Sequence, residues 1–323
     1  MKNDPKVCLT TYVYGEKYQL YIPMLLYSCY KAYPEYDVTL FIHGKLNKDV
    51  RKSIDRLELK NQIIIKENSF NDCPKISALK SKALRWILWD DNFINYDYLY
   101  TVDIDMFYIR EPIALHVQHV QHMKFLGLPF SNLLRIHRYN PFYWVTMGIR
   151  LKHAGFKSFF KFLLYSKVET KLTGLHFVDI KNYYSLFTEE LRSSFKNDIY
   201  SGNYLRHIKY PNNEIYLSKI VNKIGIDTSG LGIETNSVNM LDFTNPKRFD
   251  FRPHHGLHMG VFRSDSAVQE SKDILNSDAY MFYIEKFKET ILSDIKFIEL
   301  SKLFDKELKN QFSRMLKYYN ISK

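Results

Sequence analysis

The sequence contains few of the residues that mark disulfide-rich, zinc-binding or membrane-spanning proteins. Only three cysteines occur among its 323 residues, and none lies in a C-x-x-C pair. We therefore expect reduced thiols in a cytoplasmic protein, with neither a disulfide framework nor a zinc finger. No apolar run approaches the roughly 18–20 residues that a membrane-spanning helix needs. The first residues lead into a strand-like run and not into the apolar core of a signal peptide.

Acidic residues are also in short supply. The chain has 35 Asp and Glu against 46 Lys and Arg, which gives a formal net charge of +11. This charge favours anionic partners such as nucleic acid, anionic lipid or phosphorylated substrates. The basic residues are spread along the whole chain, however, and no long Lys/Arg block occurs. A composition of 46% hydrophobic and 25% charged residues is typical of a folded globular protein.

Strand-like and helix-like segments alternate over the first 105 residues. This alternation predicts an α/β fold whose central sheet is mainly parallel and is covered by helices on both faces. Loops after the carboxyl ends of such strands face the ligand crevice. The predicted strands are residues 7–11, 38–43, 62–65 and 98–103, and the predicted helices are residues 18–33, 48–59 and 77–89.

Residues 106–170 do not continue this alternation. Prolines interrupt the segment, and we interpret it as an insertion or lid-like region that contains a helix over residues 156–165. Three histidines within it, His116, His119 and His122, are spaced three residues apart. No carboxylate or cysteine accompanies them, so we interpret them as polar residues on a helix surface and not as metal ligands.

Two further elements and a helical region complete the chain. An apolar run after Gly174 predicts a strand over residues 172–179, and a helix over residues 210–224 would begin at an Asn N-cap, Asn212 or Asn213. Residues 264–323 show helical apolar spacing and are rich in Lys. We expect this C-terminal extension to pack on the sheet domain. Pairing with another chain, or contact of its basic face with an anionic membrane, are the alternatives.

Two carboxylates end the predicted strand over residues 98–103. Asp103 and Asp105 are one residue apart, so their side chains would point to the same side of an extended chain. Burying two like charges together is costly unless a cation or hydrogen-bond donors compensate them. They fall where open α/β folds bind ligands. We interpret them as a divalent-metal site for a nucleotide diphosphate, with a solvated polar strand end as the alternative.

A second cluster of polar residues lies near residue 258. His255, His258, Gly260 and Arg263 occur within nine residues. Imidazole can bind a metal, glycine lets the backbone approach a phosphate, and arginine binds oxygen anions. Together with the Asp103–Asp105 pair, this cluster favours a ligand site over scattered surface histidines.

Two more charged residues could belong to this site. Arg85 continues a polar helical stripe through Ser77 and Ser81, and it could serve a ribose, a phosphate or Asp103, or simply be solvated. Glu214 lies in the first turn of a predicted helix. It could act there as an acid or base aimed into the crevice, or only complement the helix dipole.

In their order, these segments resemble the GT-A-fold, nucleotide-sugar-dependent glycosyltransferases, most closely the family 8-like enzymes that include glycogenin and bacterial lipopolysaccharide glycosyltransferases. The resemblance covers roughly residues 6–263. It implies a Rossmann-like GT-A catalytic domain over residues 1–263, with the insertion at 106–170. Residues 264–323, the C-terminal helical extension, lie outside it.

Five motifs carry the resemblance. Residues 81–88 resemble the helix before the D-x-D strand, with Arg85 at its arginine, and residues 98–105 resemble that strand. Residues 173–178 resemble the later Asn-Ser-Gly-Val strand, with Thr for its Ser and Leu172 where Asn is usual. Residues 212–214 lie where the family carries an Asp-Gln-Asp-like segment. Residues 258–263 resemble the closing His-x-x-Gly-x-x-Lys motif, but with one residue fewer between His and Gly.

The resemblance implies transfer of a sugar from a nucleoside diphosphate sugar, UDP-linked, to a glycan, lipid-linked glycan or glycoprotein. Asp105 would bind Mn²⁺ or Mg²⁺, Asp103 would bridge the metal or hold the ribose, and His258, or His255 instead, would complete the metal ligands. Glu214 would be the catalytic base of an inverting enzyme, or would position a substrate in a retaining one. The residues that would bind the donor are Thr10, Thr11, Tyr12, Arg85, Asp103, Thr173, Gly174, Gly260 and Arg263.

Two other classes of function use the same residues. A metal-dependent phosphoesterase or nuclease could use Asp103, Asp105 and a histidine, but two-metal nucleases usually need further acids, and no second acidic cluster occurs. A non-catalytic protein that binds a nucleotide sugar or nucleic acid is the other alternative. We expect no nucleic-acid partner, peripheral contact with the inner face of a membrane, and oligomers formed, if at all, through the C-terminal helices.

Overall fold

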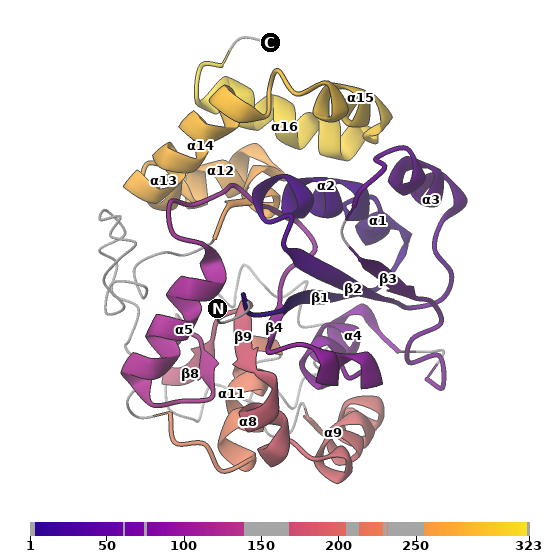
Figure 1. Cartoon of the computed structure of the whole chain (residues 1–323), viewed down its shortest axis with the longest axis vertical. Helices are drawn as coiled ribbons and strands as arrows, with labels where there is room; N and C mark the ends of the chain where they lie inside the picture. The colour runs from indigo at the N-terminus through magenta and orange to yellow at the C-terminus, as the bar shows by residue number, and fades with distance from the viewer. Residues whose placement is uncertain are drawn as a thin grey trace.

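The protein is built around one six-stranded sheet (Figure 1). The computed structural model describes residues 4–60, 62–73, 76–138, 168–204, 213–228, 231 and 255–321. Within these residues, β9 is antiparallel to its neighbours β4 and β6, and the pairs among β1 to β4 are parallel. The mainly parallel α/β sheet is therefore confirmed. Its order is β3 (Ile63–Lys66), β2 (Tyr36–Ile42), β1 (Val7–Val13), β4 (Tyr98–Thr101), β9 (His176–Asp179) and β6 (Phe130–Ser131).

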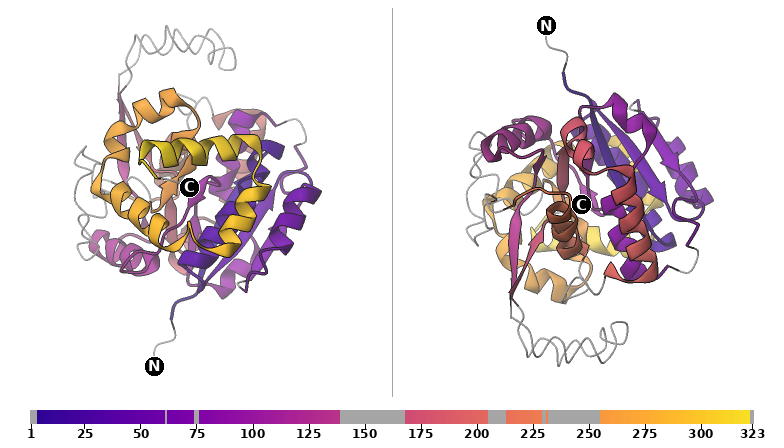
Figure 2. Two further views of the ribbon diagram at one scale, coloured as in Figure 1. Left: turned by 90° about the horizontal axis from the view of Figure 1, so that it is seen from above. Right: turned by 90° about the horizontal axis from the view of Figure 1, so that it is seen from below.

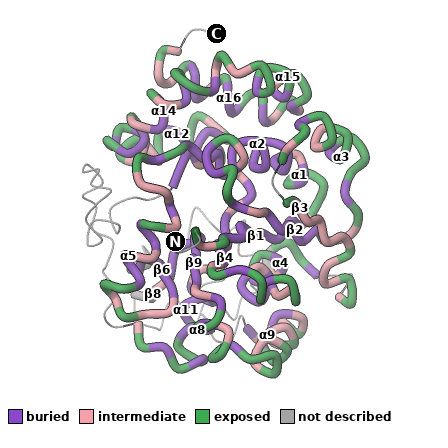
Figure 3. Tube along the Cα trace, viewed as in Figure 1, coloured by how far each residue is buried: buried purple, intermediate pink, exposed green. Residues whose placement is uncertain are grey.

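Helices cover both faces of the sheet. Alternate strand residues point to opposite sides, and because both sets are apolar, each face needs a covering layer. Val7 and Leu9 of β1 enter one hydrophobic cluster, and Cys8 enters another. The first cluster contains side chains of α2 (Ile22–Ala32) and α3 (Lys48–Asp55). The second contains side chains of α4 (Ala78–Leu84), α8 (Ile180–Leu186), α9 (Glu189–Ser201) and α11 (Asn213–Lys223). Figure 3 shows the sheet buried between these two layers.

Two predicted helices are divided in the structure. The helix expected over residues 18–33 is α1 (Glu16–Gln19) followed by α2, whose first turn contains a proline. Proline is favoured there because its missing N–H would have no partner inside the helix. The helix expected over residues 77–89 is α4, with Ser77 as its N-cap, followed by the 3₁₀ turn η1 (Arg85–Ile87).

The single strand predicted over residues 172–179 is wrong. The structure has β8 (Val168–Leu172) and β9, separated by a turn that contains Gly174. β8 pairs with β7 (Leu134–Arg138) in a separate two-stranded sheet, whereas β9 belongs to the central sheet. The change of sheet requires the chain to turn, and the apolar run alone does not reveal it.

The prediction of surface polarity for His119 and His122 is also wrong. Both histidines lie on α5 (Leu115–Leu126) with exposed fractions of 1% and 0%. Their Nδ1 atoms lie 2.9 Å and 2.8 Å from the hydroxyl oxygen of Ser131 on β6. The polar stripe of α5 therefore faces a polar side chain inside the protein. The helix predicted over residues 156–165 lies outside the described residues.

The C-terminal extension packs on the sheet domain as expected, against α2 and the pair formed by β5 (Met106–Phe107) and β10 (Leu257–His258). It comprises α12 (Asp265–Glu270), α13 (Lys272–Leu275), α14 (Asp278–Thr290), α15 (Ile295–Leu303) and α16 (Lys306–Tyr318). Phe287, Phe297 and Phe312 surround Phe107, with ring centroids 5.4–6.2 Å away. Figures 1 and 2 show these helices stacked over α2. Among the described residues, none of the helices has the length and apolar content needed to cross a bilayer.

Candidate functional site

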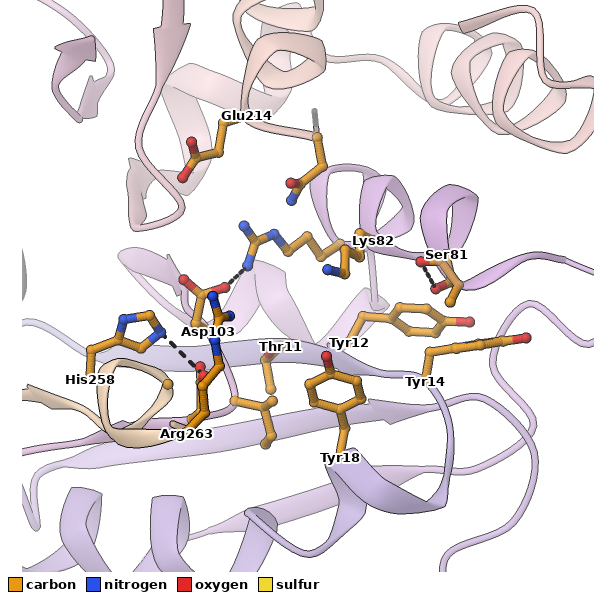
Figure 4. Close-up of a pocket in the computed structure, with 16 residues that line it drawn as sticks. Thr11, Tyr12, Tyr14, Tyr18, Ser81, Lys82, Asp103, Glu214, His258 and Arg263 are labelled. Atoms are coloured by element: carbon orange, nitrogen blue, oxygen red, sulfur yellow. Dashed lines mark hydrogen bonds and ion pairs between the residues drawn. The ribbon is translucent and has the colours of Figure 1, made fainter. Parts of the chain in front are cut away.

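A cleft of about 460 Å³ opens at the carboxyl ends of β1 and β4. The predicted residues Thr11, Tyr12, Arg85, Asp103, Asp105, Glu214, His258, Gly260 and Arg263 line it, so segments far apart in the sequence meet there. Figure 4 shows three tyrosines gathered at one end and Asp103, Glu214 and His258 toward the other. This is the edge of the sheet at which open α/β folds bind ligands.

The two carboxylates after β4 have different partners. The strand ends at Thr101, and Asp103 and Asp105 follow it on a turn. Asp103 accepts a hydrogen bond from Nη1 of Arg85 in an ion pair. Asp105 Oδ2 lies 3.2 Å from Nε2 of His258. Each carboxylate is therefore neutralised by its own cationic side chain.

Arg85 is held on three sides. Its first partner is Asp103. Its second is Asn213: with the side-chain amide oriented so that its oxygen faces Arg85, this oxygen accepts from Nε at 3.2 Å and from Nη2 at 2.9 Å. The guanidinium carbon lies 4.1 Å from the centroid of the Trp86 ring, a cation–π distance. The Trp86 indole N–H in turn donates to the Asn213 backbone oxygen at 2.8 Å. Of the partners suggested for Arg85, the structure shows Asp103.

Gly174 provides the close approach that the Arg85–Asp103 pair needs. A Cβ atom at this position would lie 2.8 Å from Asp103 Oδ2 and 3.0 Å from Arg85 Nη2. It would also lie 3.4 Å from Oε1 of Glu214. Any other residue at position 174 would therefore displace these groups. Thr173, predicted to bind the donor, is instead buried, and its hydroxyl donates to Asn132 Oδ1 at 2.7 Å. It holds the turn and does not line the cleft.

Glu214 lies in the first turn of α11 and lines the cleft. Its Oε2 lies 2.7 Å from Nζ of Lys171 on β8, and the two side chains are 18% and 17% exposed. Sequence reasoning did not identify Lys171. The α11 helix begins at Asn213, and Asn212, the other suggested N-cap, lies outside the described residues.

The Asp105–His258 pair has the electrostatics of a cation site. Burial lowers the pKa of His258, but the neighbouring Asp105 and Asp103 carboxylates outweigh it and raise this pKa to about 9. Burial raises the pKa of Asp105, yet His258 lowers it overall. The pair therefore places a full negative charge beside a nitrogen that needs a positive partner, either a proton or a metal ion.

The geometry of this pair fits a divalent metal. Adjacent ligands about 2.1 Å from an octahedral ion are about 3.0 Å apart, and Oδ2 of Asp105 lies 3.2 Å from Nε2 of His258. A Cβ atom at Gly260 would lie 2.6 Å from that oxygen, so only glycine leaves room there. Among the described residues, no group of three or more His, Cys, Asp and Glu side chains is arranged around one ion position. A metal here would have two protein ligands, with its other positions left for ligand or water oxygens.

His255, the alternative metal ligand, does not line the cleft. It is buried, with Nδ1 3.7 Å from Oε1 of Glu111 and its ring centroid 4.9 Å from that of His119. A single left-handed glycine, Gly256 with φ of 133°, separates it from β10 (Leu257–His258). On either side of this glycine, His258 lines the cleft and His255 is buried in the core.

Aromatic rings form the other end of the cleft. The hydroxyl of Tyr12 lies 3.0 Å from Nδ1 of His43, and Tyr14 and Tyr18 line the same space. Thr10 was predicted to bind the donor but does not line the cleft, and its hydroxyl donates to the carbonyl of Thr39 on the neighbouring strand at 2.9 Å. Thr11 and Tyr12, nearer the carboxyl end of β1, do line it.

Sequence reasoning also missed residues on α4. Ala78, Ser81, Lys82 and Arg85 all line the cleft, which is the i, i+3, i+4, i+7 spacing of one helix face. That spacing would have identified Lys82 once Arg85 was chosen. Among the described residues, neither Lys82 nor Arg263 has a carboxylate within ion-pair distance. Both cations are available to an anionic ligand.

No protein-family model and no curated protein sequence matches the chain. Solved structures do resemble it. Core-mannan synthase A from Aspergillus fumigatus, in its Mn/GDP form, shares 10% identity over 68% of this chain and 70% of that one, with a TM-score of 0.38. A mannosyltransferase from S. cerevisiae in complex with GDP shares 12% over 71% and 69%, with a TM-score of 0.42.

A third structure covers more of the chain. A galactosyltransferase in complex with donor and acceptor sugar analogues shares 12% identity over 91% of this chain and 99% of that one, with a TM-score of 0.41. All three TM-scores lie below 0.5. The function of this chain is therefore inferred from the residues of its own cleft.

Proposed function

We propose that the chain is a metal-dependent glycosyltransferase that uses a nucleoside diphosphate sugar as donor. The arrangement of the cleft carries this proposal: the Asp105–His258 pair, the available cations Lys82 and Arg263, and a wall of tyrosines lie around one space. A diphosphate leaving group gains negative charge as the bond to the sugar breaks, and fixed cations stabilise that charge. The tyrosines offer flat surfaces on which a nucleobase can stack.

Asp105 and His258 would hold the metal ion. Carboxylate oxygen suits both Mg²⁺ and Mn²⁺, and the imidazole nitrogen makes Mn²⁺ the more natural choice. When bound, such an ion supplies Lewis-acid stabilisation of the diphosphate oxygens. Arg263 and Lys82 would donate hydrogen bonds to the same phosphates, and Gly260 leaves room for them beside Asp105.

The remaining groups would position the two ends of the donor. Thr11 and Tyr12 would contact the base. Asp103, fixed by Arg85, would accept a hydrogen bond from a ribose or sugar hydroxyl. We propose a UDP-linked donor and a glycan, lipid-linked glycan or glycoprotein acceptor, as the family resemblance implies.

Glu214 is the proposed contact with a reacting hydroxyl. In an inverting enzyme it would take the proton of the acceptor hydroxyl, and in a retaining enzyme it would only position acceptor or sugar. Its ion pair with Lys171 fixes the carboxylate beside Gly174, close to Asp103. The anomeric configuration of the product, read by NMR, distinguishes the two roles.

Titration of UDP and GDP with and without Mn²⁺ tests the proposal. We expect one nucleotide to bind, tighter with Mn²⁺, and its sugar conjugates to be hydrolysed or transferred. Asp105→Ala should remove the effect of Mn²⁺. Binding of neither nucleotide, or metal-dependent binding that survives Asp105→Ala, would refute the site. A screen of donor hydrolysis then names nucleotide and sugar together.

A metal-dependent phosphoesterase or nuclease is less well supported. Two-metal sites need several acids around the metal pair. In the described parts of the chain, Asp103 is engaged by Arg85, and no group of three His, Cys, Asp or Glu ligands surrounds one ion position.

Membrane contact remains a separate proposal. The sequence favoured it on the lysines of the C-terminal extension, yet residues 264–323 contain as many acidic as basic residues. Electrostatic attraction to anionic lipid therefore receives no support from the charge of this region. Sedimentation with anionic vesicles would test the contact directly.

A further inference from the structure

The loop over residues 255–263 carries His258, Gly260 and Arg263, and it is fastened on two sides. On one side, β10 pairs with β5 (Met106–Phe107), and the Met259 N–H donates to the Asp105 backbone oxygen at 2.8 Å. This fastening links His258 to Asp105. On the other side, the loop meets helices α14 and α16 of the C-terminal extension.

Helix α14 contacts the loop at His258. The backbone N–H of His258 donates to the hydroxyl of Tyr280 at 3.3 Å, and the Tyr280 side chain is fully buried. Burial raises the pKa of Tyr280, so the hydroxyl stays protonated and neutral. One turn further along, the Tyr283 hydroxyl donates at 2.6 Å to Glu111, the carboxylate beside His255.

Helix α16 contacts the loop at its other end. Nη1 of Arg314 donates to the backbone oxygens of Phe262 at 3.2 Å and Arg263 at 3.0 Å. Residues Met259–Phe262 form a 3₁₀ turn, η5, and carbonyls at the end of such a turn have no partner within it. A cationic side chain there satisfies them and complements the dipole.

We propose that Tyr280 and Arg314 are positioning residues for the metal- and diphosphate-binding loop, so that the C-terminal extension is part of the catalytic apparatus. The inference rests on the proposed function. Tyr280 fixes the backbone that carries His258, and Arg314 fixes the backbone at Arg263. Metal ligands must be held within a fraction of an ångström, and groups that orient a ligand typically contribute 10–100-fold to metal affinity.

The glycines of this loop explain why contacts from outside it are important for its conformation. It contains two glycines, Gly256 and Gly260, at positions where a Cβ atom would lie 2.5–2.6 Å from a neighbouring oxygen. Glycine allows these close approaches but gives the chain more freedom to leave them. Contacts from outside the loop restrict that freedom.

Tyr280→Phe and Arg314→Met test the proposal in the full-length protein. Binding of Mn²⁺ and UDP, or GDP if that is the nucleotide bound, is measured by calorimetry. We expect Tyr280→Phe to weaken Mn²⁺ binding about tenfold, and Arg314→Met to weaken nucleotide binding about tenfold. The unfolding midpoint without ligand should fall by no more than about 4 °C, the effect of one lost hydrogen bond in a chain of this size.

Two matched variants provide controls. Tyr319→Phe removes a hydroxyl that donates to the Leu275 carbonyl at 2.7 Å, a contact within the extension. Asp265→Asn removes the carboxylate that Arg314 Nε contacts at 3.2 Å but leaves both carbonyl contacts in place. We expect wild-type affinities for both.

The outcomes separate this inference from the proposed function. If the wild-type protein binds Mn²⁺ and a nucleotide, but Tyr280→Phe and Arg314→Met bind them as tightly as the controls do, the positioning roles are refuted and the proposed function stands. If the wild-type protein binds neither nucleotide, the proposed function fails and this inference fails with it. Loss of affinity in the controls as large as in the test variants would show a general effect of destabilising the extension and would also refute it.

Discussion

Asp103 and Asp105 are one residue apart, yet they lie in two different electrostatic settings. Asp103 faces Arg85, a guanidinium that always carries its charge and is itself held by Asn213 and Trp86. Asp105 faces His258, whose positive charge is a single removable proton. A metal ion can replace that proton, but it cannot replace a guanidinium without leaving it unpaired. This difference supports the proposal that Asp105 binds the metal and that Asp103 is a fixed hydrogen-bond acceptor.

The histidines near the two carboxylates also differ in charge. Behind Asp103, the amide N–H of Asn132 donates to Nδ1 of buried His176 at 3.0 Å, and Asn132 Oδ1 accepts from Thr173 beside Gly174. Burial lowers the pKa of His176 to about 3, so this histidine is neutral. The pKa of His258, which faces carboxylates, is raised to about 9. The surroundings of Asp103 thus include a neutral histidine, whereas the partner of Asp105 is a charged one.

The largest effect should separate the two carboxylates directly. Asp105→Asn should weaken Mn²⁺-dependent nucleotide binding by about 100-fold, because it removes one of two protein ligands. Asp103→Asn should keep the Mn²⁺ dependence, since Asp103 is engaged by Arg85. Calorimetric titration of UDP or GDP with and without Mn²⁺ measures both. An equal loss of Mn²⁺ dependence in the two variants would show that both carboxylates bind the metal.

A smaller effect should follow from filling the space beside each carboxylate. A Cβ atom at Gly260 would meet Asp105 at 2.6 Å, and one at Gly174 would meet Asp103 at 2.8 Å. We expect Gly260→Ala to weaken Mn²⁺ binding about tenfold. Gly174→Ala should leave Mn²⁺ affinity near wild type and instead lower kcat for sugar transfer about tenfold, because Glu214 and Arg85 must shift.

Gly127→Ala provides a control for both, since a Cβ atom there would meet nothing within 4 Å. Its φ of 66° makes it a control for backbone strain at a remote glycine. If Gly174→Ala weakened Mn²⁺ binding as much as Gly260→Ala, the roles of the two carboxylates would not be separable.

The sequence predicted the central sheet and the ends of its first four strands well, because buried parallel strands are continuous apolar runs with turns between them. It also placed Asp103, Asp105, His258 and Arg85 in one site. The family resemblance gave the metal to Asp105 but left Asp103 either to bridge the metal or to hold the ribose. The choice between these two roles depends on Asn213 and Gly174, whose contacts with Arg85 exist only after distant segments have folded together.

Two predictions failed because they depended on which distant segments lie next to each other in the fold. The strand expected over residues 172–179 divides because β8 and β9 join different sheets, and sequence periodicity carries no information on strand partners. His119 and His122 were assigned to the surface because histidine is polar, but a buried Ser131 accepts or donates to them in the core. Lys171 was missed because a single lysine has no pattern of its own, whereas Lys82 shares a helix face with Arg85 and could have been identified from that spacing.

Lowering the pH should reduce the stability of the fold through His176, the buried histidine near Asp103. Its folded pKa of about 3 lies below the unfolded value of about 6.5. Below pH 6.5 the unfolded chain therefore binds a proton that the folded chain does not, and stability falls as the pH falls toward 3. Each pH unit in this window should cost up to about 1.4 kcal/mol of unfolding free energy from this residue. Urea titrations at several pH values should show a shallower dependence in His176→Phe, and an unchanged dependence would contradict the assignment.

The smallest effect should come from Arg85→Lys, which keeps the charge at Asp103 and removes the planar donor group. A lysine could still pair with Asp103, but its single ammonium nitrogen cannot take the places of the three guanidinium nitrogens that reach Asp103 and Asn213, and it has no planar group to lie over Trp86. We expect the free energy of unfolding to fall by about 1 kcal/mol, the usual contribution of such contacts. Mn²⁺ affinity should be unchanged, and the KM for the donor should rise a few-fold because Asp103 is less firmly held. Weaker Mn²⁺ binding in Arg85→Lys would mean that the guanidinium also organises Asp105, and the two carboxylates would then have to be treated as one unit.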